Sequence, residues 1–180
     1  MNKLRKKYNH AKKRKRYLAA KRSSDKMKRT AGNIPDHARR FPANFHCLGC
    51  GSIAIPQRML GAQFMPNNPG TAKILFAVCH CGAYVACHPF TEIPMGYPAD
   101  HRTRAARRAL HKKMDPLWNN LKGRRKAMVR ASMYEMVAEK MRIKPEMAHT
   151  GLFTTKQCAR AWHHLKNVTA AELFEYSRRK

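Results

Sequence analysis

The amino-acid sequence predicts an α+β protein: a small β domain followed by a helical C-terminal half, with a basic N-terminal arm. Three observations support this division. Positive charge is concentrated in the first 40 residues, five of the six cysteines lie between residues 47 and 87, and apolar residues recur at helical spacing after residue 99. We therefore place the boundaries at 1–40, 41–98 and 99–180.

The charge of the chain limits its partners. The 180 residues include 38 Lys and Arg but only 10 Asp and Glu, for a formal net charge of +28. Charge of this size opposes compaction unless anions are nearby, and nucleic acid is the commonest polyanion. No stretch approaches the roughly 18 apolar residues of a membrane-spanning helix, and the apolar run at 17–20 is too short for a secretory signal. We expect a cytoplasmic protein.

The first 40 residues are predicted to be an arm that is disordered alone and becomes ordered on an anionic surface. They carry 16 Lys and Arg against two Asp, and residues 12–16 are all basic. A solubility tail and a nuclear localisation signal are the alternatives. The arm supplies the first candidate nucleic-acid-binding residues: Lys6, Lys7, Lys12, Lys13, Arg14, Lys15 and Arg16.

Two cysteine pairs in the middle segment predict a structural metal site. Cys47 and Cys50 have C-x-x-C spacing, Cys79 and Cys81 are one residue closer together, and a glycine follows each pair. Structural zinc prefers four tetrahedral thiolate or imidazole ligands, and a cytosolic chain keeps its thiols reduced. We predict a structural Zn²⁺ held by these four cysteines. The C-x-C spacing leaves open that another residue replaces one of them, the alternatives being His80, Cys87 and His88.

Short apolar runs surround the cysteine pairs. Residues 52–60, 72–78 and 83–86 read as strands, and residues 66–70, with two prolines and a glycine, read as a turn. The resulting order, a cysteine pair, a hairpin, a second pair and a strand, is typical of a zinc-ribbon-like domain.

Helices are predicted in the C-terminal half. Residues 99–114 are amphipathic, Asp115 is expected to cap a short helix that Gly123 ends, and a longer helix is expected over about 128–141. A capping-box pattern at Ser132 leaves open that 124–130 is a basic linker. Further capping boxes begin at Thr154 and at Thr169.

Two basic clusters in this half are further candidates for phosphate contacts, because cations one helical turn apart match neighbouring phosphates. The alternative is an ordinary solvated helix face. The candidates are Arg104, Arg107, Arg108 and Lys112 on the first helix, and Arg124, Arg125 and Lys126 before the longer one.

Several motifs resemble a zinc-finger-containing family of unknown function found in phages and bacteria. They are residues 81–89 (Cys-Gly-Ala-Tyr-Val-Ala-Cys-His-Pro), 94–96 (Pro-Met-Gly), 108–111, 115–118, and 149–153 with Cys158. The resemblance covers about residues 45–165. It implies a phage or prophage protein with a metal-bound first half and a helical second half, and it supplies no activity. The second cysteine pair is shorter than in the family pattern, and the basic arm lies outside it.

Catalysis is not predicted, although a nuclease is kept as an alternative. The histidines among the matched motifs could serve as bases, but few acidic residues lie near them to hold Mg²⁺. The candidates weighed are His88, His111, Asp115, His149 and Cys158.

The sequence thus predicts a nucleic-acid-binding zinc protein that docks on structured RNA, with the ribosome as a candidate, through phosphate contacts of the arm and the basic helix. The alternatives are a DNA-binding protein, a zinc-stabilised nuclease, and a phage inhibitor that binds an acidic host protein.

Overall fold

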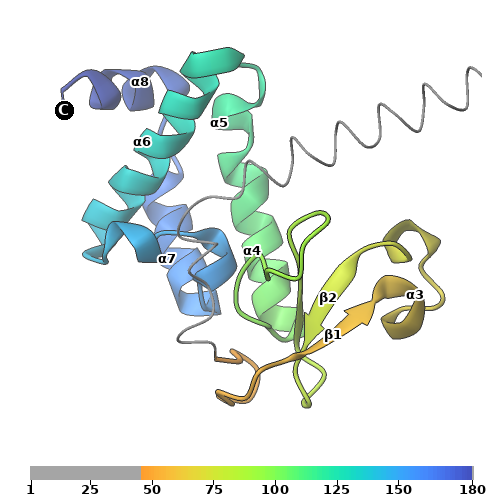
Figure 1. Ribbon diagram of the computed structural model, residues 1–180. Coiled ribbons are helices and arrows are strands. Elements are labelled where there is room, and N and C mark those ends of the chain that lie inside the picture. Colours follow the sequence, from red (N-terminus) through yellow and green to blue (C-terminus); the bar gives the residue numbers. More distant parts are fainter. Residues whose placement is uncertain (1–45, 180) are drawn as a thin grey trace, which may run out of the picture.

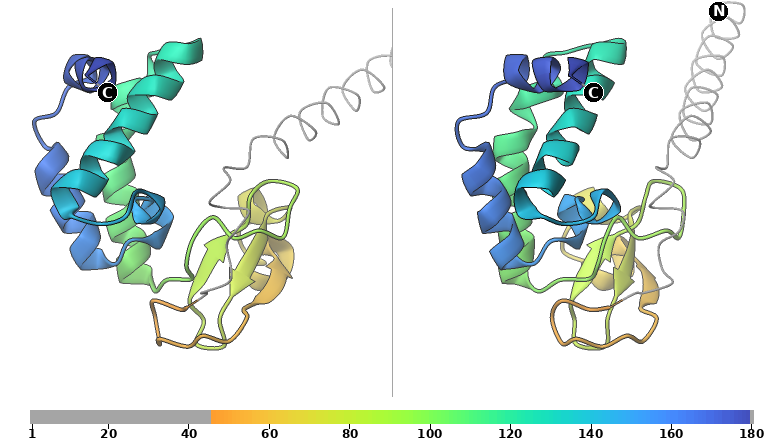
Figure 2. Two further views of the ribbon diagram at one scale, coloured as in Figure 1. Left: turned by 60° about the vertical axis from the view of Figure 1, so that its left-hand side comes forward. Right: turned by 90° about the vertical axis from the view of Figure 1, so that its left-hand side faces the viewer.

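The structure is a computed structural model that describes residues 46–179. The predictions for the arm, from Lys6 to Arg16, lie outside the described residues. A small sheet lies beside a group of helices, and α4 leads from the sheet into the helical half (Figures 1 and 2). This is the predicted α+β arrangement, with a zinc-ribbon-like sheet followed by a helical C-terminal half.

The sheet has three antiparallel strands in the order β1-β2-β3. They are β1 (Gln57–Leu60), β2 (Leu75–Val78) and β3 (Tyr84–Ala86). Gln57 is opposite Val78, and Phe76 is opposite Ala86. The first strand is shorter than predicted because its expected N-terminal half closes a turn, in which Cys47 N donates to the carbonyl oxygen of Ser52 (2.8 Å).

The connection between β1 and β2 is partly helical, where the sequence predicted a turn. It contains α3 (Gly61–Phe64) and the 3-10 helix η1 (Pro69–Thr71). The ring of Phe64 lies 6.0 Å from that of Phe76 and 4.9 Å from that of Tyr84, between centroids. The three rings contact one another, so α3 packs on aromatic side chains of β2 and β3.

The helical half contains five α-helices and two 3-10 helices in residues 101–178. They are α4 (His101–Met114), α5 (Pro116–Asn119), α6 (Gly123–Met141), η2 (Pro145–Met147), η3 (Thr150–Leu152), α7 (Thr155–Leu165) and α8 (Ala170–Arg178). Helix α4 packs against α7, and α8 packs across α6 (Figures 1 and 2). Their shared core is fully buried at Leu110, Val129, Met133, Phe153 and Leu165, among others.

Helix α6 corrects two sequence predictions. It begins at Gly123, so residues 124–130 belong to the helix and are not a linker. Ser132 is buried inside the helix and caps nothing there. Asp115 and Pro116 occupy the N-cap and the first position of the short helix α5, as predicted, but the Asp115 side chain makes no capping hydrogen bond. Helix α5 ends at Asn119, and Gly123 begins α6 instead of ending α5.

The two later capping boxes are confirmed. Thr154 accepts a hydrogen bond from Gln157 N at the start of α7, and Thr169 accepts one from Glu172 N at the start of α8. A third cap was not predicted: the Asp100 carboxylate accepts from Thr103 N (2.7 Å) and begins α4. Each cap satisfies a backbone N–H that the helix itself leaves unpaired.

The sheet and the helices meet at two glycines. A Cβ on Gly96 would collide with the carbonyl group of Gly151, and a Cβ on Gly151 would collide with that of Met95. This close approach lets Tyr97 N donate to the Gly151 carbonyl oxygen (2.9 Å). The segment before α4 is thereby joined to the segment before α7.

Within the part of the chain that the structure describes, no helix has both the length and the apolar character needed to cross a membrane.

Candidate metal centre and basic surfaces

The two cysteine pairs form turns of similar construction. In the first turn, Gly51 N donates to the carbonyl oxygen of Cys47, and in the second, Gly82 N donates to that of Cys79. Both glycines have positive φ, 75° at Gly51 and 84° at Gly82, a conformation that glycine adopts without strain. The second turn closes over one residue fewer, and this difference accommodates the C-x-C spacing.

The four predicted sulfur ligands converge. The Sγ atoms of Cys47, Cys50, Cys79 and Cys81 all lie within 4.8 Å of one another. Cys47 Sγ is 3.6 Å from Cys81 Sγ, and Cys50 Sγ is 3.7 Å from Cys79 Sγ. A tetrahedral zinc site with Zn–S bonds of about 2.3 Å requires sulfur–sulfur separations of about 3.8 Å. The four cysteines therefore fit a structural zinc ion in size and chemistry.

Backbone amides and burial shift the pKa values of these thiols in opposite directions. Gly49 N donates to Cys47 Sγ (3.3 Å). The Ala83 amide lowers the pKa of Cys81 to about 7, whereas burial raises the pKa of Cys47 to about 12. Four thiolates this close would repel one another, and a bound divalent cation would offset that repulsion.

His80 lies at the margin of the cluster. Its Nδ1 atom is 3.5 Å from Cys79 Sγ, and its Nε2 atom is 4.0 Å from Cys50 Sγ. His80 therefore faces one edge of the sulfur tetrahedron from outside. The other two alternatives lie elsewhere: the buried Cys87 directs its thiol to the Glu92 carbonyl oxygen (3.6 Å), and neither Cys87 nor His88 belongs to the cluster among the described residues.

Comparison with family sequence models gives a match to a zinc-finger-containing domain over residues 44–168. The match spans more than two thirds of the chain and includes all four clustered cysteines. The chain belongs to this zinc-finger-containing family. Comparisons with curated proteins and with solved structures gave no significant match.

Two of the sequence motifs that carry the family resemblance contact each other in the folded structure. Gly96 and Gly151, from the segments at 94–96 and 149–153, are the glycines whose backbones touch between the sheet and the helices. The matched residues thus include the junction between the two halves, and the family match runs from the cysteines past the end of α7.

The candidate basic residues of α4 separate into two groups. Arg108 and Lys112 are exposed, on the side of the helix opposite the buried Leu110. Arg107, expected on the same face, is buried, with 7% exposed surface. The prediction of one continuous basic face is wrong at this position, because Arg107 completes a core contact. Arg104 is half-buried, and its guanidinium lies 3.7 Å from the centre of the Tyr84 ring.

The second basic cluster occupies the first turn of α6. Arg124 and Arg125 are exposed, Lys126 is partly exposed, and the turn holds no acidic residue. Lys122 precedes the helix without a side-chain cap, so the first amides are not satisfied by a capping side chain. The guanidinium of Arg125 also lies over the Phe174 ring of α8 (4.8 Å).

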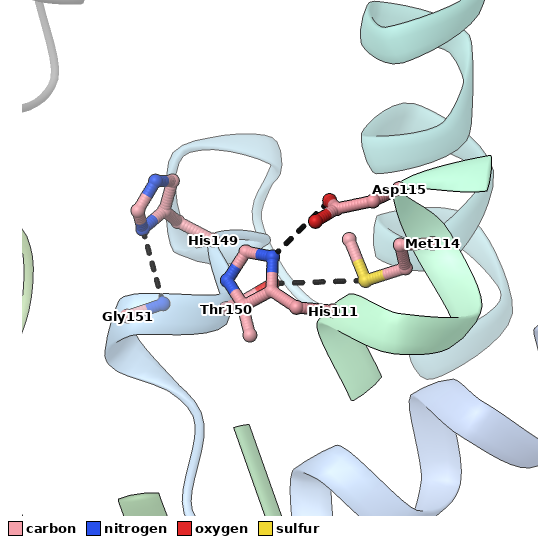
Figure 3. A network of polar contacts seen from close by, with 6 residues as sticks. All are labelled: His111, Met114, Asp115, His149, Thr150 and Gly151. Carbon is pink, nitrogen blue, oxygen red and sulfur yellow. Dashed lines mark hydrogen bonds and ion pairs between the residues drawn. The ribbon is translucent and has the colours of Figure 1, made fainter. Parts of the chain in front are cut away.

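The residues weighed for catalysis are only partly brought together. His111 Nδ1 lies 3.5 Å from Asp115 Oδ1, and both side chains are almost half exposed (Figure 3). His149 accepts a hydrogen bond at Nδ1 from Gly151 N (3.2 Å), and its ring stacks on that of Tyr134. Cys158 is buried in the core, where desolvation raises its pKa to about 11. Such a thiol is a poor nucleophile at neutral pH.

Sequence reasoning missed a further group of basic residues. Lys140 and Arg142 at the end of α6 line a pocket together with Arg160, His163 and His164 of α7. The only sequence signal was the i, i+3, i+4 spacing of the α7 residues, since the two helices are brought together by tertiary packing.

Proposed function

We propose that this protein binds nucleic acid through phosphate contacts and that its zinc site supports the fold. The observation that carries the proposal is a set of cations on α4 and in the first turn of α6 that form no ion pair with an acidic side chain among residues 46–179. Residues 46–179 contain 21 Lys and Arg against eight Asp and Glu. The basic arm adds to this excess in the full chain.

Four acidic side chains of the helical half make hydrogen bonds or ion pairs within the fold. Asp100 caps α4, and Glu172 caps α8. Asp115 is paired with His111, and Glu139 accepts a hydrogen bond from the hydroxyl of Tyr176 (2.6 Å). Neither Arg108 nor Lys112 forms an ion pair with a carboxylate among the described residues, so an external polyanion can pair with both.

The first turn of α6 offers a second reason. Cations at a helix N-terminus are unfavourable because the helix dipole is positive there. Arg124, Arg125 and Lys126 all lie in this position, where side chains of the opposite charge would stabilise the helix. A phosphate bound at this turn would reverse the penalty, since it would meet both the cations and the first backbone amides.

The zinc site is assigned a structural role in this proposal. When bound, zinc would cross-link the two turns, and four thiolates leave no open position for a substrate or an activated water. Cys47, Cys50, Cys79 and Cys81 would fix the end of the sheet. Leu48 N donates to the Pro98 carbonyl oxygen (2.8 Å), so the same cross-link would hold the segment that leads into α4.

Structured RNA is the nucleic acid we propose, with the ribosome as a candidate. A small zinc-stabilised globule with a long basic extension resembles the construction of ribosomal proteins, in which extensions fill channels between RNA helices. The family resemblance further suggests a phage-encoded protein that acts in the cytoplasm of a bacterial host.

The experiment measures the binding of the full chain to a structured ribosomal RNA fragment, a duplex DNA and a single strand across a range of salt concentrations. For about a dozen phosphate contacts, the log–log salt slope should be about −5 or steeper. RNA recovered with the tagged protein from bacteria is sequenced in parallel. Enrichment of a defined RNA is expected, and a salt-insensitive complex would instead indicate a protein partner.

A matched pair of variants locates the contact. Arg108→Gln with Lys112→Gln removes two exposed charges from α4, and Lys73→Gln with Arg179→Gln removes two exposed charges outside α4, α6 and α7. The first pair should make the salt slope less steep by about 1.5, since each lost phosphate contact removes about 0.7–0.9. The second pair should change it less. Equal effects would contradict a role for α4.

A further inference from the structure

The pocket between α6 and α7 is unusual for the kind of side chains that line it. Its volume is about 650 Å³, and it opens between the C-terminal end of α6 and the exposed side of α7. Five of its lining residues are basic or titratable to a cation, and Ala159 is the sixth. No Asp or Glu is among the described residues that line it. The five are Lys140, Arg142, Arg160, His163 and His164.

The backbone fixes where these side chains begin. Arg142 ends α6 in the left-handed conformation (φ 54°), and its N–H donates to the carbonyl oxygens of Ala138 and Glu139. Arg160 Nη2 lies 3.4 Å from the Met141 carbonyl oxygen, which ties α7 to the end of α6. The main chain therefore holds the two helices on either side of this open pocket in place.

The cations in the pocket act on one another. The imidazole rings of His163 and His164 are 5.9 Å apart between centroids. Partial desolvation lowers the pKa of His164, and the charges of His163, Lys140 and Arg160 lower it further. Cationic side chains thus gather near His164, and none of the described residues that line the pocket is acidic. The adjacent carboxylate of Glu139 is hydrogen-bonded to Tyr176 on α8.

We propose that this pocket binds a backbone phosphate of the same nucleic acid whose binding is proposed above, at a position separate from α4. The chemistry is that of a phosphate oxyanion: Arg142 and Arg160 offer planar N–H donors, Lys140 offers a point charge, and the two histidines offer ring N–H groups. The pocket is large enough for a phosphate with its flanking sugars.

The position of the pocket has a structural consequence. Helix α7 packs against the buried face of α4, whereas Arg108 and Lys112 lie on the opposite face. The pocket is on the exposed side of α7. Two phosphate-binding surfaces therefore lie on different sides of the helical half, so the protein contacts two separate backbone segments, as in a folded RNA.

The first test uses inorganic phosphate as a probe of the pocket in the full-length, zinc-loaded protein. Histidine ring resonances are followed by NMR during titration with phosphate, with sodium chloride adjusted to keep the ionic strength constant. Single His163→Gln and His164→Gln variants assign the two signals. We expect both signals to shift and to saturate. Lys140→Gln with Arg142→Gln should weaken the response about tenfold, since two charge-assisted contacts are lost. An equal response to chloride alone would overturn the proposal.

The second test measures RNA binding by the same variants. Lys140→Gln with Arg142→Gln should make the salt slope less steep by about 1.5, more than Lys73→Gln with Arg179→Gln, which removes equal charge outside α4, α6 and α7. Thermal unfolding confirms that each variant is folded. If RNA binding were reduced equally in the two double variants, the pocket would not be a phosphate site, but the proposed function would not be contradicted. Saturable phosphate binding without RNA binding by the wild type would overturn the proposed function.

Discussion

Arg107 Nε donates a hydrogen bond to the backbone carbonyl oxygen of Phe153 (3.0 Å), and the guanidinium is buried. Its Nη1 atom donates to the carbonyl oxygen of Tyr97 (2.9 Å). One α4 side chain thus joins the segment that leaves the sheet to the segment that begins α7. Desolvation lowers the pKa of Arg107 to about 10, which still leaves it charged at neutral pH.

We expect Arg107→Met to lower the free energy of unfolding by about 2–4 kcal/mol, because two buried carbonyl oxygens lose their donors. Chemical unfolding followed by circular dichroism measures the change. Arg108→Met is the control, since Arg108 is exposed and neighbours it in sequence. We expect the control to be nearly as stable as the wild type but weaker in RNA binding. A stable Arg107→Met variant with weakened RNA binding would contradict the structural role.

The contact between Gly96 and Gly151 gives a second prediction. Gly151→Ala would place a methyl group against the carbonyl group of Met95, which is backbone and cannot swing away. We expect a loss of about 1–3 kcal/mol in unfolding free energy, as for other overpacked sites. Gly70→Ala is the control because the added Cβ there would contact only the side chain of Asn68. Equal stability of the two variants would show that the junction can relax.

The N-cap of α4 makes stability depend on pH. The Thr103 N–H lowers the pKa of Asp100 from its ordinary value of 3.8. A carboxyl with a lowered folded-state pKa stabilises the protein above its unfolded pKa, and this contribution is lost as the pH falls through the folded pKa. We expect Asp100→Ala to cost about 1 kcal/mol at pH 7 and less below about pH 4.

Asp100→Asn separates capping from charge, because asparagine also caps helices well and does not titrate. The difference between Asp100→Asn and Asp100→Ala should persist at low pH. Loss of zinc in acid affects all the variants alike, so only differences between them are compared in thermal unfolding. A wild-type advantage over Asp100→Ala that stays constant down to pH 2 would refute the assignment.

The parts of the fold that sequence predicted are those set by local signals. The cysteine pairs, the capping boxes at Thr154 and Thr169, and the order of sheet and helices depend on spacing within a few residues. The buried state of Arg107 was not predictable, because its partners at Tyr97 and Phe153 lie 10 and 46 residues away. The helix start suggested by the capping-box pattern at Ser132 was wrong for a related reason. A capping pattern has no effect where the helix has already begun.

The zinc site supplies the last prediction. Cys81→Ser should abolish stoichiometric zinc binding, measured by mass spectrometry under native conditions, because one of four converging thiolates is removed. His80→Ala should retain one zinc ion, since His80 faces the cluster from outside. Cys158→Ser is the control for a cysteine outside the site.

Removal of zinc with a chelator should disorder the cysteine turns and the sheet. The helical core has its own apolar contacts, so its helical circular dichroism signal should be kept. Loss of zinc in His80→Ala, with zinc retained in Cys81→Ser, would show that His80 is a zinc ligand in place of Cys81.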